Sequence, residues 1–292
     1  MDKLHLVYIP FTGVGIYSGF RGDEWLKYRI EIFKEFTLKS LLNQTTKDWI
    51  LWLSFRQEEK KNPLVKDFWH FLVDQNIKFV ITYNGLIYHD DKYSKGTLNK
   101  ILNFGRIIRS CWREKNFSNL KSATREILYD KNKALPQRLA SSLAYFKGWV
   151  NDYKWIYLTR LDSDDMFHKD ALKEIQSQPA SDKAAYLIKK GYVYNKNTQE
   201  LAEWNPDNNP PFYTIVFPKE TFLDPQKHLK YMEGFQSHED IPKIFDSKWL
   251  RNGLYCVLVH SQQISTIFNH PFRGEVIRQA NMKAEILRDF GI

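Results

Sequence analysis

Three carboxylates follow one another closely in the middle of the chain, within the sequence WIYLTRLDSDD at residues 155–165. Asp162, Asp164 and Asp165 come directly after an apolar run, so we expect them at the end of a buried strand. Hard divalent cations prefer oxygen ligands, and they commonly use only one or two protein carboxylates when they also carry a diphosphate. Asp162 and Asp164 therefore predict a metal site. A cation would also relieve the repulsion among three neighbouring acids, a task that Arg160 could share.

The same acids have a structural alternative. A helix is expected to begin near Met166 and to continue through residues 171–176, and aspartate is favoured at helix N-caps and in first helical turns. Asp164 or Asp165 could cap that helix, and the acid cluster alone does not decide between the two interpretations. If the acids form a metal site in a hydrated loop, Asp164→Asn is expected to abolish metal-dependent binding and to leave the fold intact.

The elements around the acids indicate an α/β fold. The run at 155–159 shows no polar alternation, which is typical of a strand buried on both faces in a parallel sheet covered by helices. Ligands of such sheets bind beyond the carboxyl ends of the strands. In the first third of the chain, strands and helices are expected to alternate as in a doubly wound sheet. The expected strands are 5–10, 49–54 and 77–82, and the expected helices are 25–42, 64–74 and 135–149.

The chain after the acids predicts more strands and one irregular loop. Strands are expected at 184–188, 212–217 and 254–259, together with a hairpin that joins 189–194 to 200–204. The sequence NPDNNPP at 205–211 predicts a loop, either over the site or on the plain surface. Pro242 suits the first turn of a short helix.

Length and charge indicate one domain over residues 1–292 that contains a basic insertion at about 84–138. The net charge of the chain is +9, and the insertion holds twelve Lys and Arg against five Asp and Glu, an excess of seven. Apolar and basic residues alternate between 98 and 113 at helical spacing, which predicts a basic amphipathic helix. We favour a helix packed on the domain with a solvated basic face. Contact with an anionic membrane is the alternative.

The cysteines and the apolar segments bear on location. Cys111 and Cys256 lie far apart and match no metal or redox spacing, which indicates reduced thiols in a reducing compartment. The apolar stretch 4–16 lacks a basic leader and contains Pro10 and two glycines, so a strand and a loop are expected there instead of a signal peptide. No stretch reaches membrane-spanning length. No recognised nucleic-acid motif accompanies the positive charge, so nucleic acid is not an expected partner.

Four segments resemble nucleotide-sugar glycosyltransferases of the GT-A fold: residues 44–52, the run RLDSDD at 160–165, the tripeptide His-Glu-Asp at 238–240, and the late His260. The sequence is most similar to the rhamnosyltransferase group of this class. The resemblance extends from the first strand to about Phe272 and leaves out the basic insertion. RLDSDD, which contains a DXD motif, is fairly specific in this setting, whereas His-Glu-Asp alone is weak. The resemblance implies a Rossmann-like, mostly parallel sheet flanked by helices, with an acceptor-side half at about 184–272.

The resemblance also implies roles for single residues. Asp162 would contact the ribose or the metal, Asp164 would hold the metal on the diphosphate, and His260 would complete the metal site. Asp240 would be the catalytic base, and Glu239 beside it would orient the loop or contact the acceptor. The structural alternative for His260 is a strand-terminal histidine bonded to a backbone carbonyl. For Glu239 and Asp240 the alternative is that they are favourable charges at a helix N-terminus.

Donor binding involves further candidates. Arg160 is one, and Thr12 is another, because it begins a glycine-bearing loop whose backbone could approach a nucleotide. A plain surface turn is the alternative for that loop. No obvious acid follows the strand at 49–54, where relatives often hold the nucleobase, so Arg56 or the pair Asp90 and Asp91 are candidates for that place.

An enzyme of this kind would move a sugar from a nucleoside diphosphate to a hydroxyl of a glycan or glycolipid, as in polysaccharide biosynthesis, with inversion at the anomeric centre. Mg²⁺ and Mn²⁺ both accept this oxygen set, and the ion would stabilise the diphosphate leaving group. One alternative is a nucleotidyltransferase, and another is a non-catalytic basic protein that binds nucleic acid or membrane. The expected location is the cytoplasm, with peripheral contact at the inner face of a membrane as an option.

Overall fold

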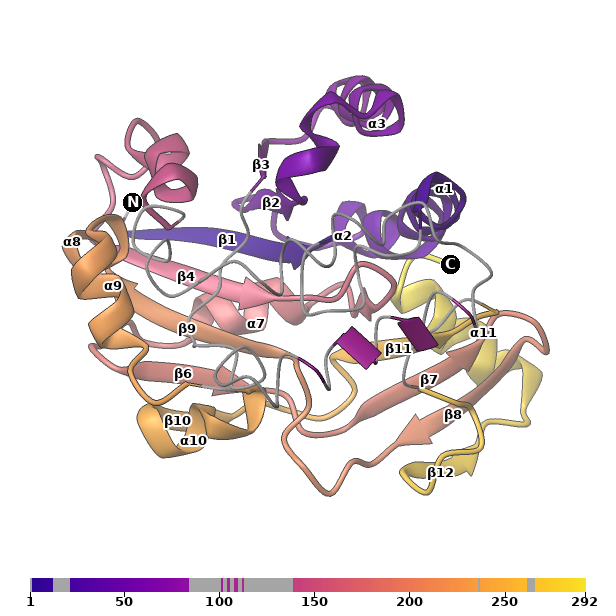
Figure 1. Ribbon diagram of the computed structural model, residues 1–292. Helices are drawn as coiled ribbons and strands as arrows, with labels where there is room; N and C mark the ends of the chain where they lie inside the picture. The colour runs from indigo at the N-terminus through magenta and orange to yellow at the C-terminus, as the bar shows by residue number, and fades with distance from the viewer. Residues whose placement is uncertain are drawn as a thin grey trace.

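The computed structural model describes residues 2–12, 22–83, 139–235, 237–261 and 266–292, together with six single positions between 101 and 112. Apart from those six positions, the basic insertion predicted at 84–138 lies outside the described residues, and so do Asp90, Asp91 and Cys111. The described part contains two β-sheets with helices around them (Figure 1).

The larger sheet is mostly parallel. Its seven strands lie in the order β10-β6-β9-β4-β1-β2-β3, and every neighbouring pair is parallel except the two pairs that β9 makes with β4 and β6. The strands are β1 (Lys3–Pro10), β2 (Ile50–Ser54), β3 (Phe79–Thr82), β4 (Trp155–Arg160), β6 (Ala184–Leu187), β9 (Tyr213–Pro218) and β10 (Asp246–Trp249). Helices flank this sheet, so the predicted α/β class with a Rossmann-like, mostly parallel sheet is confirmed.

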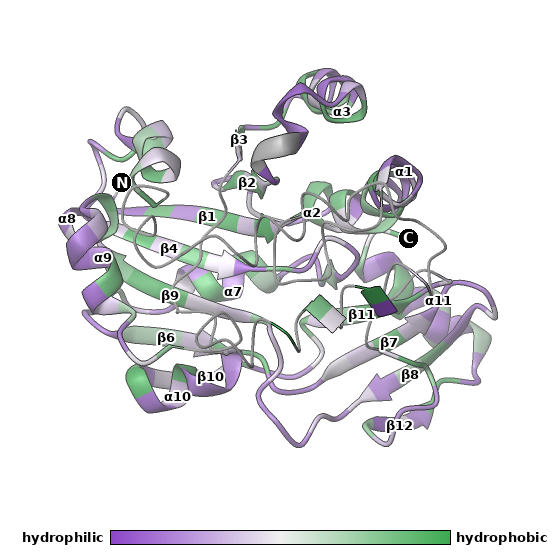
Figure 2. Ribbon diagram, in the orientation of Figure 1, coloured by the Kyte–Doolittle hydropathy of each residue, from purple (hydrophilic) through white to green (hydrophobic). Residues whose placement is uncertain are grey.

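Strand β4 is buried on both faces, as its uninterrupted apolar run predicts. Ile156 and Leu158 pack into the apolar cluster on one face of the sheet, and Tyr157 packs into the cluster on the other. Side chains from the helices complete both clusters, and Figure 2 shows the hydrophobic residues concentrated along the strands. Residues from α1 (Gly22–Ile32), α2 (Leu38–Leu42), α3 (Pro63–Asp74) and α7 (Ala171–Ser177) join the cluster around Tyr157. Residues from the 3₁₀ turn Ala144–Phe146, α8 (Lys219–Leu223), α9 (Pro225–Tyr231) and α10 (Ile241–Ile244) join the other.

The helix predicted at 25–42 forms as one continuous helical segment. It consists of α1 (Gly22–Ile32), a π-helical turn (Phe33–Thr37) and α2 (Leu38–Leu42). The next helix, α3, begins at Pro63, and the side chain of Asn62 caps it by accepting a hydrogen bond from Leu64 N at 2.9 Å. A proline in the first turn and an asparagine before it are strong start signals, which is why the sequence places this helix well.

The direction of the strand order reverses between β1 and β4. From β1 the chain passes outward to β2 and β3, whereas β4 pairs with the other edge of β1, in a register that sets Tyr8 opposite Arg160. In open α/β sheets the crevice beyond the carboxyl ends of two such strands is the usual ligand position. Residues that follow β1 and β4 are therefore the first to consider for a site.

The smaller sheet has the strand order β12-β8-β7-β11-β5. It contains β5 (Met166–Phe167), β7 (Gly191–Asn195), β8 (Glu200–Trp204), β11 (Tyr255–Val259) and β12 (Arg273–Val276). Strands β7 and β8 form the predicted antiparallel hairpin. The last helix, α11 (Ala280–Asp289), lies beyond the segment that the sequence resemblance covers.

The prediction that a helix begins near Met166 is wrong about where the helix starts. Met166 and Phe167 form strand β5, paired with Cys256 and Tyr255, and the helix begins only at Ala171, with Asp170 at the N-cap position. Neither Asp164 nor Asp165 caps a helix, so that structural alternative for the two acids is removed. In the described part of the chain, no helix has the length and apolar character needed to cross a bilayer.

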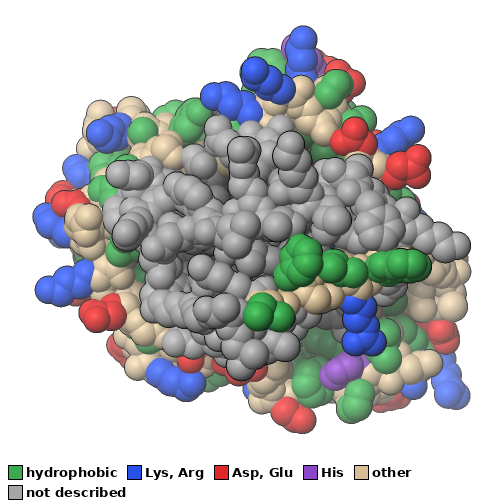
Figure 3. Space-filling model, in the orientation of Figure 1, with side chains coloured by type: hydrophobic (Ala, Val, Ile, Leu, Met, Phe, Trp, Pro, Cys, Tyr) green, Lys and Arg blue, Asp and Glu red, His purple; other side chains and the backbone are tan. Residues whose placement is uncertain are grey.

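Charged side chains are scattered over the described surface. In Figure 3 the Lys and Arg side chains lie around the rim of the molecule and are interspersed with Asp and Glu. This agrees with the sequence count, in which the insertion holds seven of the nine net positive charges. The part of the chain outside the insertion therefore carries a net charge close to zero.

Candidate active site

The acidic segment 161–165, called here the acid loop, joins the two sheets. It leaves β4 at the switch point, where Leu161 N donates to Tyr8 O at 3.1 Å, and it leads directly into β5 of the smaller sheet. Asp165 N donates to Asp162 O at 3.2 Å, which closes a tight turn. The loop thus brings three carboxylates into the space between the sheets.

Asp164 is held by two side chains from distant parts of the chain. Nη1 of Arg29 lies 2.5 Å from Oδ2 of Asp164, and Nε2 of His260 lies 3.1 Å from the same oxygen. Asp164 is only 9% exposed, so the hydrated loop expected from the sequence is wrong. Burial alone would raise the pKa of Asp164, but the charge of Arg29 and the hydrogen bonds from His260 and Arg29 outweigh it and lower the pKa to about 2.

Arg29 is the site residue that sequence reasoning missed most clearly. It lies on α1, is 5% exposed, and its guanidinium carbon lies 5.0 Å from the centre of the Trp25 ring. Among the described residues its Nε has no hydrogen-bond partner. A signal was available, because Leu26, Arg29, Ile30 and Phe33 share the buried helix face at spacings of three and four residues. A charge at such a position needs a buried partner.

Asp165 anchors the acid loop to the smaller sheet. Its Oδ1 accepts a hydrogen bond from Leu258 N at 3.0 Å, in strand β11. Burial raises the pKa of Asp165 well above its ordinary value, and the charges of Asp164 and Asp162 raise it further.

Asp162 pairs with Arg160 at the more open side of the loop. Oδ1 of Asp162 accepts a hydrogen bond from Nη2 of Arg160 at 3.1 Å. This contact agrees with the expectation that Arg160 neutralises one of the acids. Burial opposes the charge on Arg160, but Asp162 and a hydrogen bond with Tyr213 raise its pKa. Two arginines thus pair with two of the three carboxylates, so the repulsion among the acids is reduced without a cation.

Thr12 and Arg56 meet at the neighbouring strand ends, beyond β1 and β2. The backbone N of Arg56 donates to Oγ1 of Thr12 at 3.0 Å and to Oε2 of Glu59 at 3.0 Å, and the Thr12 hydroxyl donates to the same glutamate oxygen. Glu59 is an acid that reaches back to the end of the strand at 50–54, where none was expected. The charged run QEEKK at 57–61 resembles ordinary surface sequence, which is why Glu59 was missed.

Glu239 and Asp240 lie at the start of a short helical segment that leads into α10. Oδ2 of Asp240 accepts from Ser237 N at 2.9 Å, and its Oδ1 lies 3.0 Å from Nζ of Lys243. Oε1 of Glu239 accepts from the Asn208 side chain at 3.1 Å. Asp240 therefore has the helix-start contacts that the structural alternative describes, and its catalytic role stays a prediction.

His238 is the first residue of the same tripeptide and is partly buried. Burial lowers the pKa of His238, and the charge of Arg160 lowers it further, so the ring lies within electrostatic reach of Arg160 and Asp162. The loop at 205–211 packs against this turn, with Asn209 Nδ2 donating to His238 O at 2.6 Å. Two buried polar atoms here, Nδ1 of His238 and Oδ1 of Asn209, have no partner among the described residues. Such atoms are rare and often face a ligand or water.

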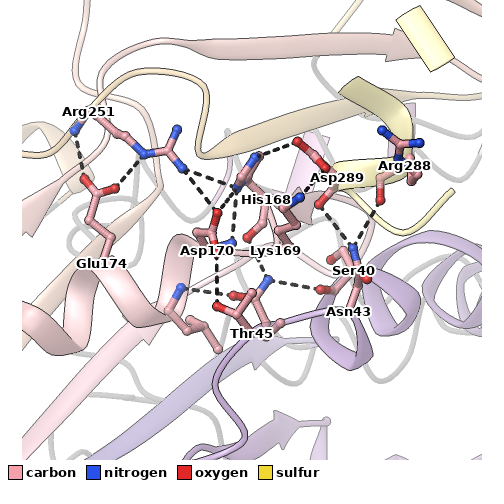
Figure 4. A network of polar contacts seen from close by, with 12 residues as sticks. Ser40, Asn43, Thr45, His168, Lys169, Asp170, Glu174, Arg251, Arg288 and Asp289 are labelled. Atoms are coloured by element: carbon pink, nitrogen blue, oxygen red, sulfur yellow. Dashed lines mark hydrogen bonds and ion pairs between the residues drawn. The ribbon is translucent and has the colours of Figure 1, made fainter. Parts of the chain in front are cut away.

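A polar network holds the far side of the acid loop in place (Figure 4). Gln44 donates to His168 O at 2.8 Å and accepts from Leu172 N at 3.0 Å. His168 Nε2 lies 3.3 Å from Oδ2 of Asp289, at the end of α11, and Lys169 Nζ lies 2.7 Å from its Oδ1. The chain just after the acids is thus fixed to α2 and to the C-terminal helix.

The donor set at Asp164 and His260 fits a divalent cation. Neighbouring ligands of an octahedral ion with bonds of about 2.1 Å lie about 3 Å apart, and Oδ2 of Asp164 and Nε2 of His260 are 3.1 Å apart. Within the described ranges, no three His, Cys, Asp or Glu side chains form a metal-binding group. Asp162 pairs with Arg160 instead of joining the other two.

The comparisons with known proteins give a distant likeness. No family model matches the chain, and no curated protein matches it. Among solved structures the chain is similar to the inositol-1-phosphate CTP transferase from T. maritima, with 11% identity, a TM-score of 0.39 and coverage of 99% of this chain and 96% of that chain. It is also similar to a protein from Desulfovibrio desulfuricans G20 described as a nucleotide-diphospho-sugar transferase, with 13% identity, a TM-score of 0.35 and coverage of 88% and 81%. Likeness at these TM-scores assigns neither substrate nor site residues.

Proposed function

We propose that the protein is a transferase that takes a sugar from a nucleoside-diphosphate sugar and passes it to a hydroxyl of a glycan or glycolipid. The observation that carries the proposal is the gathering of Arg29, Arg160, Asp162 and Asp164 beyond the carboxyl ends of β1 and β4. Ligands of open α/β sheets bind at this switch point. Arginines beside carboxylates suit a diphosphate with its cation, because guanidinium groups bind phosphate oxygens in a bidentate manner.

Asp164 and His260, with Asp162 beside them, are the proposed ligands of a Mg²⁺ or Mn²⁺ ion. When bound, the ion would stabilise the negative charge that develops on the diphosphate leaving group. Arg160 is close enough to Asp162 to orient that carboxylate and to offer its remaining N–H groups to phosphate oxygens. Thr12, Arg56 and Glu59 at the ends of β1 and β2 are the proposed nucleoside side of the crevice.

The acceptor side is proposed to lie at 237–240 and in the loop at 205–211. Asp240 would take the proton of the acceptor hydroxyl, and Glu239 would help to place the acceptor. His238 and Asn209 would bind substrate hydroxyls through their unpartnered buried atoms. Substrate hydroxyls are suitable partners because they can both donate and accept hydrogen bonds.

A donor screen tests this function. The protein is incubated with UDP-, GDP- and dTDP-sugars in Mg²⁺ or Mn²⁺, and release of the nucleoside diphosphate is measured. Parallel reactions with nucleoside triphosphates and sugar phosphates measure pyrophosphate. We expect diphosphate release from one donor class and metal-dependent thermal protection by the matching nucleoside diphosphate. Pyrophosphate without diphosphate release would instead identify a nucleotidyltransferase, and no response to any nucleotide would exclude both enzymes.

The basic insertion at 84–138 gives a separate proposal, which rests on charge alone. Each basic residue near an anionic bilayer contributes roughly 1 kcal/mol of attraction, so a cluster of this size is sufficient for peripheral binding. Co-sedimentation with liposomes that contain anionic lipid, at low and at high salt, tests it. If the protein stays in the supernatant at low salt, the insertion has no membrane role.

A further inference from the structure

Arg29 contacts the same carboxylate oxygen of Asp164 that a metal ion held by Asp164 and His260 would use. Nη1 of Arg29 lies 2.5 Å from Oδ2 of Asp164, the same oxygen that faces His260. An ion bonded to this oxygen at about 2.1 Å could be no farther than about 4.6 Å from Nη1, the sum of the two distances. At this separation, in a buried site, a divalent cation and a guanidinium repel each other strongly.

Asp164 is the one carboxylate that forms an ion pair with Arg29 in the described part of the chain, whereas Asp164 itself also contacts His260. Arg29 is 5% exposed and packs its guanidinium over the Trp25 ring, so solvent screens its charge poorly. Nε of Arg29 has no hydrogen-bond partner among the residues that the structure describes. An ion that takes Asp164 away therefore leaves an arginine with unmet hydrogen-bonding capacity beside it.

A diphosphate resolves this conflict, because it brings negative oxygens for both the ion and the guanidinium. We propose that Arg29 is an internal counter-ion that competes with the divalent cation for Asp164, so that the cation binds well only when a diphosphate accepts Arg29. This inference rests on the proposed function for the identity of the diphosphate, but the competition itself concerns only this chain and the ion. Arg29 is a positioning residue until the diphosphate binds.

Binding of Mn²⁺ alone, measured from the free-ion electron paramagnetic resonance signal, tests the competition. In Arg29→Gln the amide can still donate to Asp164 but the charge is gone. We expect Mn²⁺ to bind this variant at least about tenfold more tightly than the unmodified protein, because an adjacent arginine shifts proton binding to an aspartate by about 1–3 pKa units. The gain should vanish in Arg29→Gln/Asp164→Asn. Arg29→Lys, which keeps the charge, should bind Mn²⁺ as the unmodified protein does.

Lys34→Gln is the matched control, because Lys34 also pairs with a carboxylate, Glu31 at 3.1 Å, in the same helical segment but outside the site. It should leave Mn²⁺ binding unchanged. Arg29→Met is a second uncharged variant if Arg29→Gln does not fold, and Mn²⁺ should raise the melting temperature of either more than that of the unmodified protein. Equal or weaker Mn²⁺ binding in a folded uncharged variant would overturn the inference.

The outcomes separate this inference from the proposed function. Tighter Mn²⁺ binding in Arg29→Gln, combined with no response to UDP, GDP or dTDP, would support the competition and reject the transferase. Metal-dependent nucleotide binding, combined with unchanged Mn²⁺ affinity in Arg29→Gln, would support the transferase and reject the competition.

Discussion

The guanidinium of Arg29 and the carboxylate of Asp164 form a buried ion pair, with Nη1 2.5 Å from Oδ2. The pair connects helix α1 to the acid loop at the point where the two sheets meet. The pair therefore has two roles: it holds the acid loop in place, and its arginine sets the positive charge beside Asp164 that a bound ligand would face. Each role leads to a different measurement.

The first prediction is that Asp164→Asn destabilises the protein by about 3–5 kcal/mol, because it leaves Arg29 buried and unpaired. This reverses the expectation from the sequence that the fold would be unaffected. Urea unfolding measures the effect, and Asp67→Asn on the exposed face of α3 is the control, with little change expected. The double variant Arg29→Met/Asp164→Asn should be more stable than the sum of the single changes predicts. Additive effects would show that the pair contributes no coupling energy.

The second prediction concerns pH and Asp165, whose pKa is raised in the folded protein mainly by burial. The folded state keeps a proton that the unfolded state releases near pH 4, so the stability of the unmodified protein falls as pH rises above that value. Asp165→Asn removes this dependence and keeps an oxygen for the Leu258 N–H. The melting temperature of the variant, relative to that of the unmodified protein, should therefore rise as the pH increases from 5 to 8. A constant difference across this range would contradict the raised pKa.

The third prediction is that His238→Ala lowers kcat/KM for the sugar donor or acceptor by at least about tenfold, a loss of one substrate hydrogen bond of about 1.5 kcal/mol. The reason is the buried Nδ1, which has no partner among the described residues. His70→Ala, at an exposed position of α3, should leave kinetics unchanged. Asn209→Ala should show the same kind of loss. Unchanged kinetics in both site variants, with folding intact, would remove these residues from the substrate site.

The sequence predicted the main sheet well where burial follows directly from local pattern. The apolar run at 155–159 became a strand buried on both faces, and the turn residues Asn-Lys-Asn at 195–197 indicated the hairpin. It failed at Met166, where helix was expected and strand β5 forms, because pairing with Tyr255 and Cys256 overrides local preference. That pairing joins segments almost ninety residues apart, which no local pattern contains.

The site was predicted only in part for the same reason. The sequence indicated Asp162 and Asp164 because acids at a strand end form a local motif. The structure places His260 3.1 Å from Asp164, and the metal-binding role of these residues stays a prediction. Arg29 was not found, since its partner lies far away in sequence and its only signal is a charge on the apolar face of a helix. Glu59 was hidden in a charged surface run. Long-range pairing of charges therefore accounts for the parts that the sequence did not predict.

The last prediction is that Asp240 acts as the general base and that the reaction inverts the anomeric centre. An acceptor hydroxyl is a poor nucleophile at neutral pH, so a carboxylate that takes its proton speeds attack. Asp240→Asn should keep donor binding and reduce turnover by roughly 10²-fold or more. Asparagine is a suitable replacement because its carbonyl oxygen can still accept from Ser237 N and keep the helix start.

Because Asp240 also has structural contacts, the controls must separate the two roles. Ser237→Ala removes the hydroxyl that accepts from Glu239 N, and Lys243→Met removes the ion pair with Asp240, while both leave the Asp240 carboxylate in place. We expect either variant to retain most of the turnover. If both lose as much turnover as Asp240→Asn, the carboxylate acts through the helix start and not on the acceptor. Product stereochemistry measured by NMR gives the independent test, because direct attack assisted by a base inverts the anomeric centre, and retention would take the general-base role in single-step inversion away from Asp240.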